Sequence, residues 1–151
     1  MYRHILIPTD GSELSRNAVQ YGISLAKAVN AKVTGITVTI PFHVFSLDYK
    51  MIEDTADSYK KRMEVVAAKY LEQVKDAAKA GVSCDTVHVE NEHPYRAIID
   101  AAKEEGCDLI VMASHGRGGL SAIVLGSQTL KVLTHSTIPV LVYREAPRTL
   151  L

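Results

Sequence analysis

The sequence predicts a doubly wound α/β fold, in which helices cover both faces of a five-stranded parallel sheet. Strand-like and helix-like segments alternate along the chain in the order βαβαβαβαβ. Such alternation is typical of a parallel sheet, because each pair of parallel strands needs a crossover connection. Residues 5–8 and 108–113 are short and continuously apolar, as expected of strands that are covered on both faces.

Amphipathic periodicity defines the first helix, and alternation defines the second strand. Apolar residues at steps of three and four form one stripe, which consists of Leu14, Ala18, Tyr21, Leu25 and Val29. That stripe predicts a helix that begins after the N-cap candidate Ser12 and ends near Asn30. Residues 32–40 alternate and are rich in β-branched types, so they predict a strand, which Pro41 ends.

A long helix follows a stretch that has no readable periodicity. That stretch, from Phe42 to Tyr49, could form a lid over a site or a simple connection. From about Lys50 one helical face is expected to pack in the core, and it consists of Ile52, Ala56, Tyr59, Met63, Val66, Tyr70, Val74 and Ala77. Gly81 is placed to end this helix, and residues 83–90 alternate as a third strand.

The last third of the chain predicts two helices and two strands. Pro94 suits the first turn of a helix, whose inward residues are Ala97, Ile98, Ala101 and Ala102. The remaining elements are a strand at residues 108–113, a helix at residues 127–136 and a strand from Ile138 to Tyr143. No linker or repeat interrupts this order, so residues 1–151 are expected to form a single domain.

Charge and composition narrow the classes of function. Lysine plus arginine and aspartate plus glutamate number 17 each, so no net field attracts nucleic acid or a membrane. No apolar stretch approaches the roughly 18 residues of a membrane span, and Met1 leads into a strand rather than a signal peptide. Cys84 and Cys107 are interpreted as small buried residues rather than a disulfide. A cytoplasmic protein without nucleic-acid or membrane partners is expected.

The most informative stretch is the glycine-rich segment after the fourth predicted strand. Residues 114–119 are small and rich in glycine, and Gly126-Ser127 then opens a helix. Glycines let a backbone approach an anion closely, and the free N–H groups at a helix N-terminus attract phosphate. A Walker A loop is excluded, because no Gly-Lys-Ser/Thr occurs. A Rossmann fingerprint fits poorly, because it would follow the first strand.

These glycines resemble the motif G-x2-G-x9-G-[ST] of universal stress proteins, whose loop wraps the ribose and phosphates of ATP. Gly116 is followed by nine residues and then by Gly126-Ser127, whereas Ala113 stands where the motif has its first glycine. Residues 5–12 and 139–142 are also similar to the family, so the resemblance spans nearly the whole chain. It implies a three-layer α/β/α, adenine nucleotide α-hydrolase-like fold with strand order 3-2-1-4-5. It also implies ATP (or ADP or AMP) as ligand and a role in stress adaptation.

The implied strand order puts the carboxyl ends of the first and fourth strands at a topological switch point, where such sheets bind ligands. The nucleotide-binding residues expected there are Pro8, Thr9, Asp10, Val38, Met112, Ala113, His115, Gly116, Arg117, Gly126, Ser127 and Gln128. Gly116, Gly126 and Ser127 are the best phosphate candidates. Asp10 could cap the first helix, accept from ribose hydroxyls or share Mg²⁺ with the phosphates. Val38 matches a family position whose backbone contacts adenine, or it simply fills the core.

Two further positions have alternative interpretations. Arg117 could donate to a phosphate or point into solvent, and His115 is expected to pack or to assist the backbone. A family glycine at position 113 either supplies a positive φ, which Ala113 would disturb, or gives room beside the ribose, where alanine is the smallest intrusion.

An ATP-binding protein that acts through its nucleotide-bound state is the favoured function, with no catalytic residue assigned. One alternative is a dimeric interaction module that has lost nucleotide binding. The other is a weak ATPase or adenylate-transferring enzyme. The apolar strand from Ile138 to Tyr143 would form an exposed sheet edge, and the resemblance implies that two copies pair through it as a homodimer.

Overall fold

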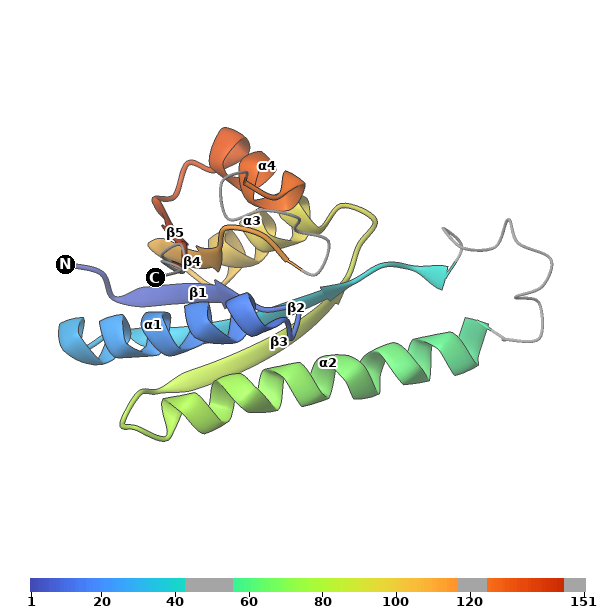
Figure 1. The fold of residues 1–151 in the computed structure, drawn as a ribbon, viewed down its shortest axis with the longest axis horizontal. Helices are drawn as coiled ribbons and strands as arrows, with labels where there is room; N and C mark the ends of the chain where they lie inside the picture. Colours follow the sequence, from blue (N-terminus) through green and yellow to red (C-terminus); the bar gives the residue numbers. More distant parts are fainter. Residues whose placement is uncertain (43–55, 117–124, 146–151) are drawn as a thin grey trace, which may run out of the picture.

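The computed structural model describes residues 1–42, 56–116 and 125–145, and it has a five-stranded parallel sheet between two layers of helices (Figure 1). The elements in chain order are β1 (His4–Pro8), α1 (Glu13–Val29), β2 (Lys32–Thr39), α2 (Ala56–Ala78), β3 (Cys84–Glu90), α3 (Pro94–Glu104), β4 (Leu109–Ala113), α4 (Ser127–His135) and β5 (Val140–Tyr143). The strands are ordered β3-β2-β1-β4-β5, which confirms the predicted fold class and the order 3-2-1-4-5.

Two buried clusters hold the layers together, one on each face of the sheet. Ile5 and Ile7 of β1 pack with residues of α1 and α2, whereas Leu6 packs with residues of α3 and α4. All three side chains are fully buried. Successive residues of β1 point to opposite faces, and both faces are covered. This is why the strand reads as a continuous apolar run.

The helix α1 begins and ends as the sequence predicts. Ser12 is the N-cap, and its hydroxyl accepts from the backbone N–H of Ser15 at 3.3 Å. Asn30 is the C-cap, with a left-handed φ of 58°. Asp10 is not the cap, so that predicted role was wrong: its carboxylate accepts from the N–H of Ser12 at 3.0 Å, in the turn before the helix. Asp10 precedes the N-cap by two residues, so the capping position belongs to Ser12.

The helix α2 buries a face adjacent to the one predicted. Its buried residues are Ala67, Leu71, Val74 and Ala78, and of these the predicted stripe contains Val74 alone. Tyr59 and Tyr70 are only half-buried. The predicted start near Lys50 and residues 43–49 of the predicted lid lie outside the described residues. Beyond the helix, Gly81 has a φ of 107° and turns the chain toward β3.

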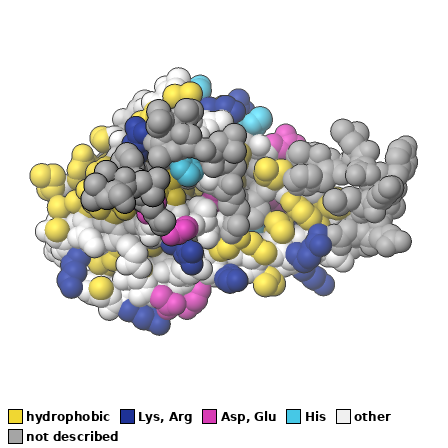
Figure 2. Space-filling model, viewed as in Figure 1, with side chains coloured by type: hydrophobic (Ala, Val, Ile, Leu, Met, Phe, Trp, Pro, Cys, Tyr) yellow, Lys and Arg dark blue, Asp and Glu magenta, His cyan; other side chains and the backbone are white. Residues whose placement is uncertain are grey.

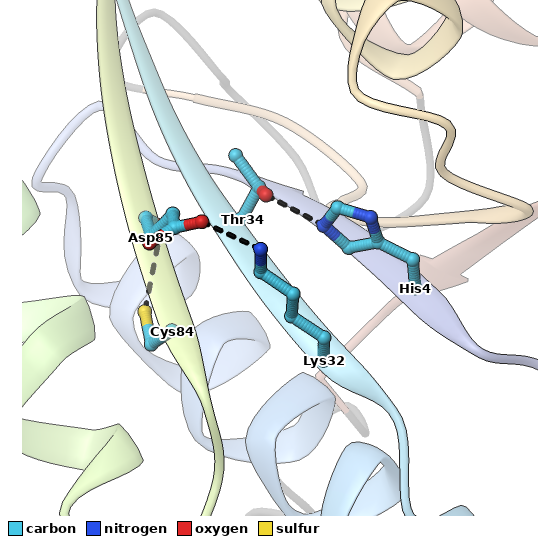
Figure 3. Close-up of polar contacts among 5 residues, drawn as sticks. All are labelled: His4, Lys32, Thr34, Cys84 and Asp85. Carbon is cyan, nitrogen blue, oxygen red and sulfur yellow. Dashed lines mark hydrogen bonds and ion pairs between the residues drawn. The ribbon is translucent and has the colours of Figure 1, made fainter.

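Polar contacts join β1, β2 and β3 at the amino ends of the strands (Figure 3). His4 Nε2 lies 2.7 Å from the Thr34 hydroxyl, and the Lys32 ammonium lies 2.6 Å from the Asp85 carboxylate. The hydrogen bond from Lys32 holds the pKa of Asp85 below its ordinary value. The Cys84 thiol donates to the carbonyl of Asp85 at 3.5 Å. Because the ion pair is exposed to solvent, it adds little to stability.

Both cysteines carry free thiols, as expected from the sequence. Cys107 is buried, and burial raises the pKa of its thiol to about 12. Cys84 is only half-buried, because it lies on the edge strand β3. A thiol with a raised pKa carries little thiolate at neutral pH, so Cys107 acts as a packing residue.

Asp108 fastens the amino-terminal segment to the chain just before β4. Its carboxylate accepts from the backbone N–H groups of Arg3 at 2.9 Å and His4 at 3.1 Å. Burial by itself would raise the pKa of Asp108, but these hydrogen bonds outweigh burial and lower the pKa. A lowered pKa stabilises the fold above the unfolded-state value of about 3.9, and this contribution is lost as the pH falls through the folded-state value.

The substitution Asp108→Asn is therefore expected to lower the free energy of unfolding by about 1 kcal/mol at pH 7. The loss should shrink near pH 3, where the parent carboxyl is itself becoming protonated. Urea unfolding at the two pH values measures both quantities. Asp100→Asn, at an exposed position of α3, is the control and should change neither. An equal loss from Asp108→Asn at both pH values would show that charge has no part in the contact.

Candidate functional site

A pocket of about 360 Å³ opens at the carboxyl ends of β1, β2 and β4. Eleven residues of the predicted site line it, namely Pro8, Thr9, Asp10, Val38, Met112, Ala113, His115, Gly116, Gly126, Ser127 and Gln128. The twelfth, Arg117, lies outside the described residues. The pocket lies where β1 runs between β2 and β4, which is the switch point of this sheet.

The end of β1 and the segment after β4 meet at one wall of the pocket. A Cβ atom at Gly116 would overlap the carboxylate of Asp10, so these two residues are in direct contact. Gly11, the neighbour of Asp10, has a φ of 77°, and a Cβ atom there would overlap the ring of Tyr70 from α2. A side chain at Gly116 would force the Asp10 carboxylate to move, and one at Gly11 would force the Tyr70 ring to move. The Asp10 carboxylate thus lies at the pocket wall.

The lining includes residues that the sequence analysis missed, namely Ser15, Ile36, Pro94, Ile98 and Thr129. Ser15 accepts from the N–H of Asp10 and donates to the hydroxyl of Thr9, each at 3.1 Å. Its side chain is buried, with 4% of the residue exposed. Ser15 follows the N-cap Ser12 by one helical turn. The only sign of this role in the sequence was that Ser15 is a small polar residue next to the apolar stripe of α1.

The first turn of α4 offers backbone donors to the pocket. Gly126 is the N-cap, and because glycine has no side chain it makes no capping bond to the N–H groups that follow it. The N–H of Gly126 donates to the carbonyl of Ser114 at 2.8 Å, and the Thr129 hydroxyl donates to the carbonyl of Ala113 at 2.9 Å. These two bonds hold the start of α4 against the end of β4. Free N–H groups and the positive end of the helix dipole suit an anion.

Ala113 fits this arrangement without strain. Within the described part of the chain, Asn30 is the only non-glycine residue with a positive φ, so Ala113 has an ordinary strand backbone. The interpretation that position 113 requires a positive φ was therefore wrong for this chain. The Ala113 side chain packs in a buried cluster with Leu14 and Ala18 of α1. The extra methyl group is thus accommodated by the first helix.

His115 lies between the end of β4 and the start of α4. Its Nδ1 is 3.3 Å from the carbonyl of Gly116. A Cβ atom on Gly126 would come within 3.0 Å of the His115 Cα atom, so the backbones of these two residues are closely packed. The geometry is compatible with the packing role predicted for His115.

The opposite part of the pocket is apolar. Ile36 and Val38 from β2, Ile98 from α3 and Met112 from β4 line it. All four belong to the core cluster under α3 and α4 or pack against it. Pockets of this kind hold flat organic ligands, while a few polar groups fix the orientation of the ligand. The pocket therefore combines an apolar wall with backbone hydrogen-bond donors.

Basic side chains surround Tyr95, at the start of α3 and next to the pocket residue Pro94. The Arg96 guanidinium and the Lys131 ammonium lie 5.7 and 5.6 Å from the centre of the Tyr95 ring. The ring of His135 lies 5.1 Å from it. Figure 2 shows His, Lys and Arg side chains gathered over α3 and α4, at the top of the view. The two positive charges beside the Tyr95 ring favour an anionic ligand nearby.

Two features are absent from residues 1–42, 56–116 and 125–145, the part of the chain that the structure describes. These residues contain no group of three or more His, Cys, Asp or Glu residues arranged to hold a metal ion. They also contain no helix with the length and hydropathy needed to cross a membrane. Among these residues, Asp10 therefore belongs to no such metal-binding cluster.

Comparison with known proteins identifies the family. Residues 1–144 match the model of the universal stress protein family. The chain is 34% identical to universal stress protein YxiE of Bacillus subtilis, and the match covers 95% of this chain and 100% of the relative. It is 32% identical to universal stress protein MJ0531 of Methanocaldococcus jannaschii, and the match covers 96% of this chain and 84% of the relative.

Two solved structures share the fold over nearly their whole length. The structure of protein MJ0577, also from Methanocaldococcus jannaschii, matches with a TM-score of 0.81 at 29% identity and covers 97% of this chain and 98% of its own. A universal stress protein in complex with cAMP matches with a TM-score of 0.69 at 26% identity, and the match covers 96% of this chain and 99% of that protein. The sheet order, the family match and the relatives together show that this chain belongs to the universal stress protein family.

Proposed function

We propose that this protein binds an adenine nucleotide, ATP in particular, in the pocket at the carboxyl ends of β1, β2 and β4. The observation that carries the proposal is the start of α4, whose free N–H groups border a pocket with an apolar wall. The phosphates would bind at Gly126 and Ser127, where the helix dipole favours negative charge. The base would lie against Val38, Ile98 and Met112. The related structure in complex with cAMP supports a nucleotide as the ligand class.

Asp10 is proposed to lie beside the ribose or to share a Mg²⁺ ion with the phosphates. Its carboxylate lies at the pocket wall against Gly116, which brings a negative charge close to the proposed phosphate site. A single carboxylate suits Mg²⁺, because this ion is often held by one or two carboxylates together with substrate phosphates. The residues present therefore fit a nucleotide with or without Mg²⁺.

Release of bound ligand tests the proposal directly. Freshly purified protein is denatured, and the supernatant is separated by chromatography to detect ATP, ADP or AMP. Calorimetry on nucleotide-free protein, with and without Mg²⁺, then measures the affinity. If no nucleotide is released and none gives a heat of binding, the nucleotide proposal fails. The interaction module without a nucleotide then becomes the preferred function.

We also propose that the nucleotide-bound state acts in stress adaptation in the cytoplasm, and that the protein forms a homodimer through β5. β5 is the outermost strand on its side of the sheet. The half-exposed Tyr21 of α1 lies beside it, with its ring 5.6 Å from that of Tyr143. An apolar edge of this kind invites pairing with a second strand.

The dimer is expected to dissociate when a charge is placed on β5. Val142 is half-buried in this strand and lies opposite Met112 of β4. Val142→Lys should convert the dimer into a monomer at micromolar concentration, as measured by light scattering. Val65→Lys, on the exposed side of α2 where Val65 is 71% accessible, is the control and should remain dimeric. A parent protein that is monomeric under these conditions would remove the dimer from the proposal.

A further inference from the structure

The side chain of Gln128 connects the N-termini of α3 and α4. Gln128 is the second residue of α4, and its Oε1 accepts from the backbone N–H of Tyr95, in the first turn of α3, at 2.9 Å. The N-cap residue of α3, His93, makes no side-chain capping bond. Gln128 thus performs for α3 the function that an N-cap side chain normally has. The starts of two helices, each with the positive end of its dipole, meet at this residue.

This hydrogen bond fixes the orientation of the amide group. A backbone N–H can only donate, so the atom of Gln128 that faces Tyr95 must be the carbonyl oxygen. The NH2 group of Gln128 therefore takes no part in the contact with the Tyr95 N–H. Gln128 lines the pocket, and no acceptor for this NH2 group is found among the residues that the structure describes. What Gln128 offers to a ligand is thus a pair of hydrogen-bond donors.

We propose that Gln128 is a specificity-determining residue, whose NH2 group donates to a phosphate oxygen of the bound nucleotide. The inference rests on the proposed nucleotide-binding function. Phosphate is the expected acceptor because Gln128 belongs to the same helical turn as Ser127. The free N–H groups of this turn attract an anion. The Tyr95 N–H prevents the amide from turning over to present its oxygen. The side chain therefore selects for an acceptor-rich anionic group at this point of the ligand.

The variant Gln128→Glu separates this role from the capping of α3. A carboxylate can still accept from the Tyr95 N–H, and a negative charge is favourable at a helix N-terminus. The second oxygen, however, replaces the donor NH2 group with a negatively charged acceptor. The thermal stability of the ligand-free protein should therefore be retained. ATP affinity in calorimetry at pH 8 should fall at least tenfold.

Adenosine, which lacks phosphates, identifies the part of the ligand that Gln128 contacts. Its affinity should differ less than twofold between the parent and Gln128→Glu. Gln128→Leu removes both the donor and the cap without adding charge. It should lower the melting temperature, and it should reduce the affinity for ATP more than the affinity for adenosine. This variant therefore tests the inference if the glutamate variant does not fold.

Each outcome has a distinct meaning. Undiminished ATP affinity in Gln128→Glu overturns the inference and leaves the proposed function in place. An equal loss for ATP and adenosine overturns it as well, because the contact would then lie away from the phosphates. A parent protein that binds neither ligand shows that the proposed nucleotide function itself has failed.

Discussion

The substitution Gly126→Ala is expected to weaken ATP binding at least tenfold, a loss of about 1.4 kcal/mol or more. The added Cβ atom would lie 3.0 Å from the Cα atom and 3.2 Å from the Cβ atom of His115. Either His115 or the first turn of α4 must move to relieve this contact. Both border the proposed phosphate site, so the N–H donors would lose their alignment. Backbone strain is not the cause, because Gly126 has a φ of −63° and a ψ of 155°, which alanine adopts readily.

Calorimetry with ATP measures the effect, and thermal unfolding without ligand shows whether the fold itself is weakened. Thr134→Ala is a suitable control on the same helix. Thr134 is exposed near the C-terminal end of α4, and its hydroxyl donates only to the carbonyl of Leu130, at 2.8 Å. It should leave ATP affinity within a factor of two. Parent-like affinity in Gly126→Ala would place the phosphates elsewhere than at the start of α4.

The order and type of the elements could be predicted because local patterns are consistent with the fold. In β1 the continuous apolar run reflects two covered faces, and in α1 the cap residues Ser12 and Asn30 mark both ends. The order of the strands could not be derived from these patterns. Alternation implies parallel pairing, but it does not say on which side of β1 each strand is added. That information came from the family resemblance.

The buried face of α2 was predicted incorrectly for a physical reason. The stripe chosen from the sequence favoured large side chains such as Tyr59 and Met63. The structure instead buries the neighbouring face with Ala67, Leu71, Val74 and Ala78, because that face of α2 is the one that packs on β2 and β3. In Figure 1 the amino-terminal part of α2 continues past the end of β3. Tyr59 in that part is only half-buried, and its hydroxyl donates to the carbonyl of Ile40, just after β2, at 2.7 Å.

Part of the site could be predicted from the sequence, because the spacing of glycines indicates where backbone segments approach their neighbours closely. A Cβ atom at Gly116 would meet the Asp10 carboxylate, and one at Gly126 would meet His115, closely enough that the neighbour must move. Ser15 could not be read in the same way, since its role depends on the hydroxyl of Thr9, which only the folded chain brings within 3.1 Å. Hydrogen bonds between side chains on different elements leave no periodic trace in a sequence.

A second large effect is expected at Gly11, where Gly11→Ala should lower the free energy of unfolding by about 3 kcal/mol. Two costs add at this position. A side chain at a φ of 77° is strained, and such strain costs about 1–3 kcal/mol. The Cβ atom would also overlap the ring of Tyr70, so the ring or the helix α2 that carries it must shift away from the turn that carries Asp10. An overpacked contact of this kind typically costs about 1–3 kcal/mol.

Gly106 provides a matched control that separates the two costs. Its φ is 72°, close to that of Gly11, but a Cβ atom there would have no neighbour within 4 Å. Gly106→Ala should therefore show the backbone cost alone, about 1 kcal/mol. Urea unfolding of both variants gives the difference, which is the cost of the overlap with Tyr70. Adding Tyr70→Ala to Gly11→Ala should remove that difference, since the smaller side chain leaves room for the new Cβ atom. If Gly11→Ala and Gly106→Ala cost the same, the ring of Tyr70 does not press on the turn, and α2 has no part in positioning Asp10.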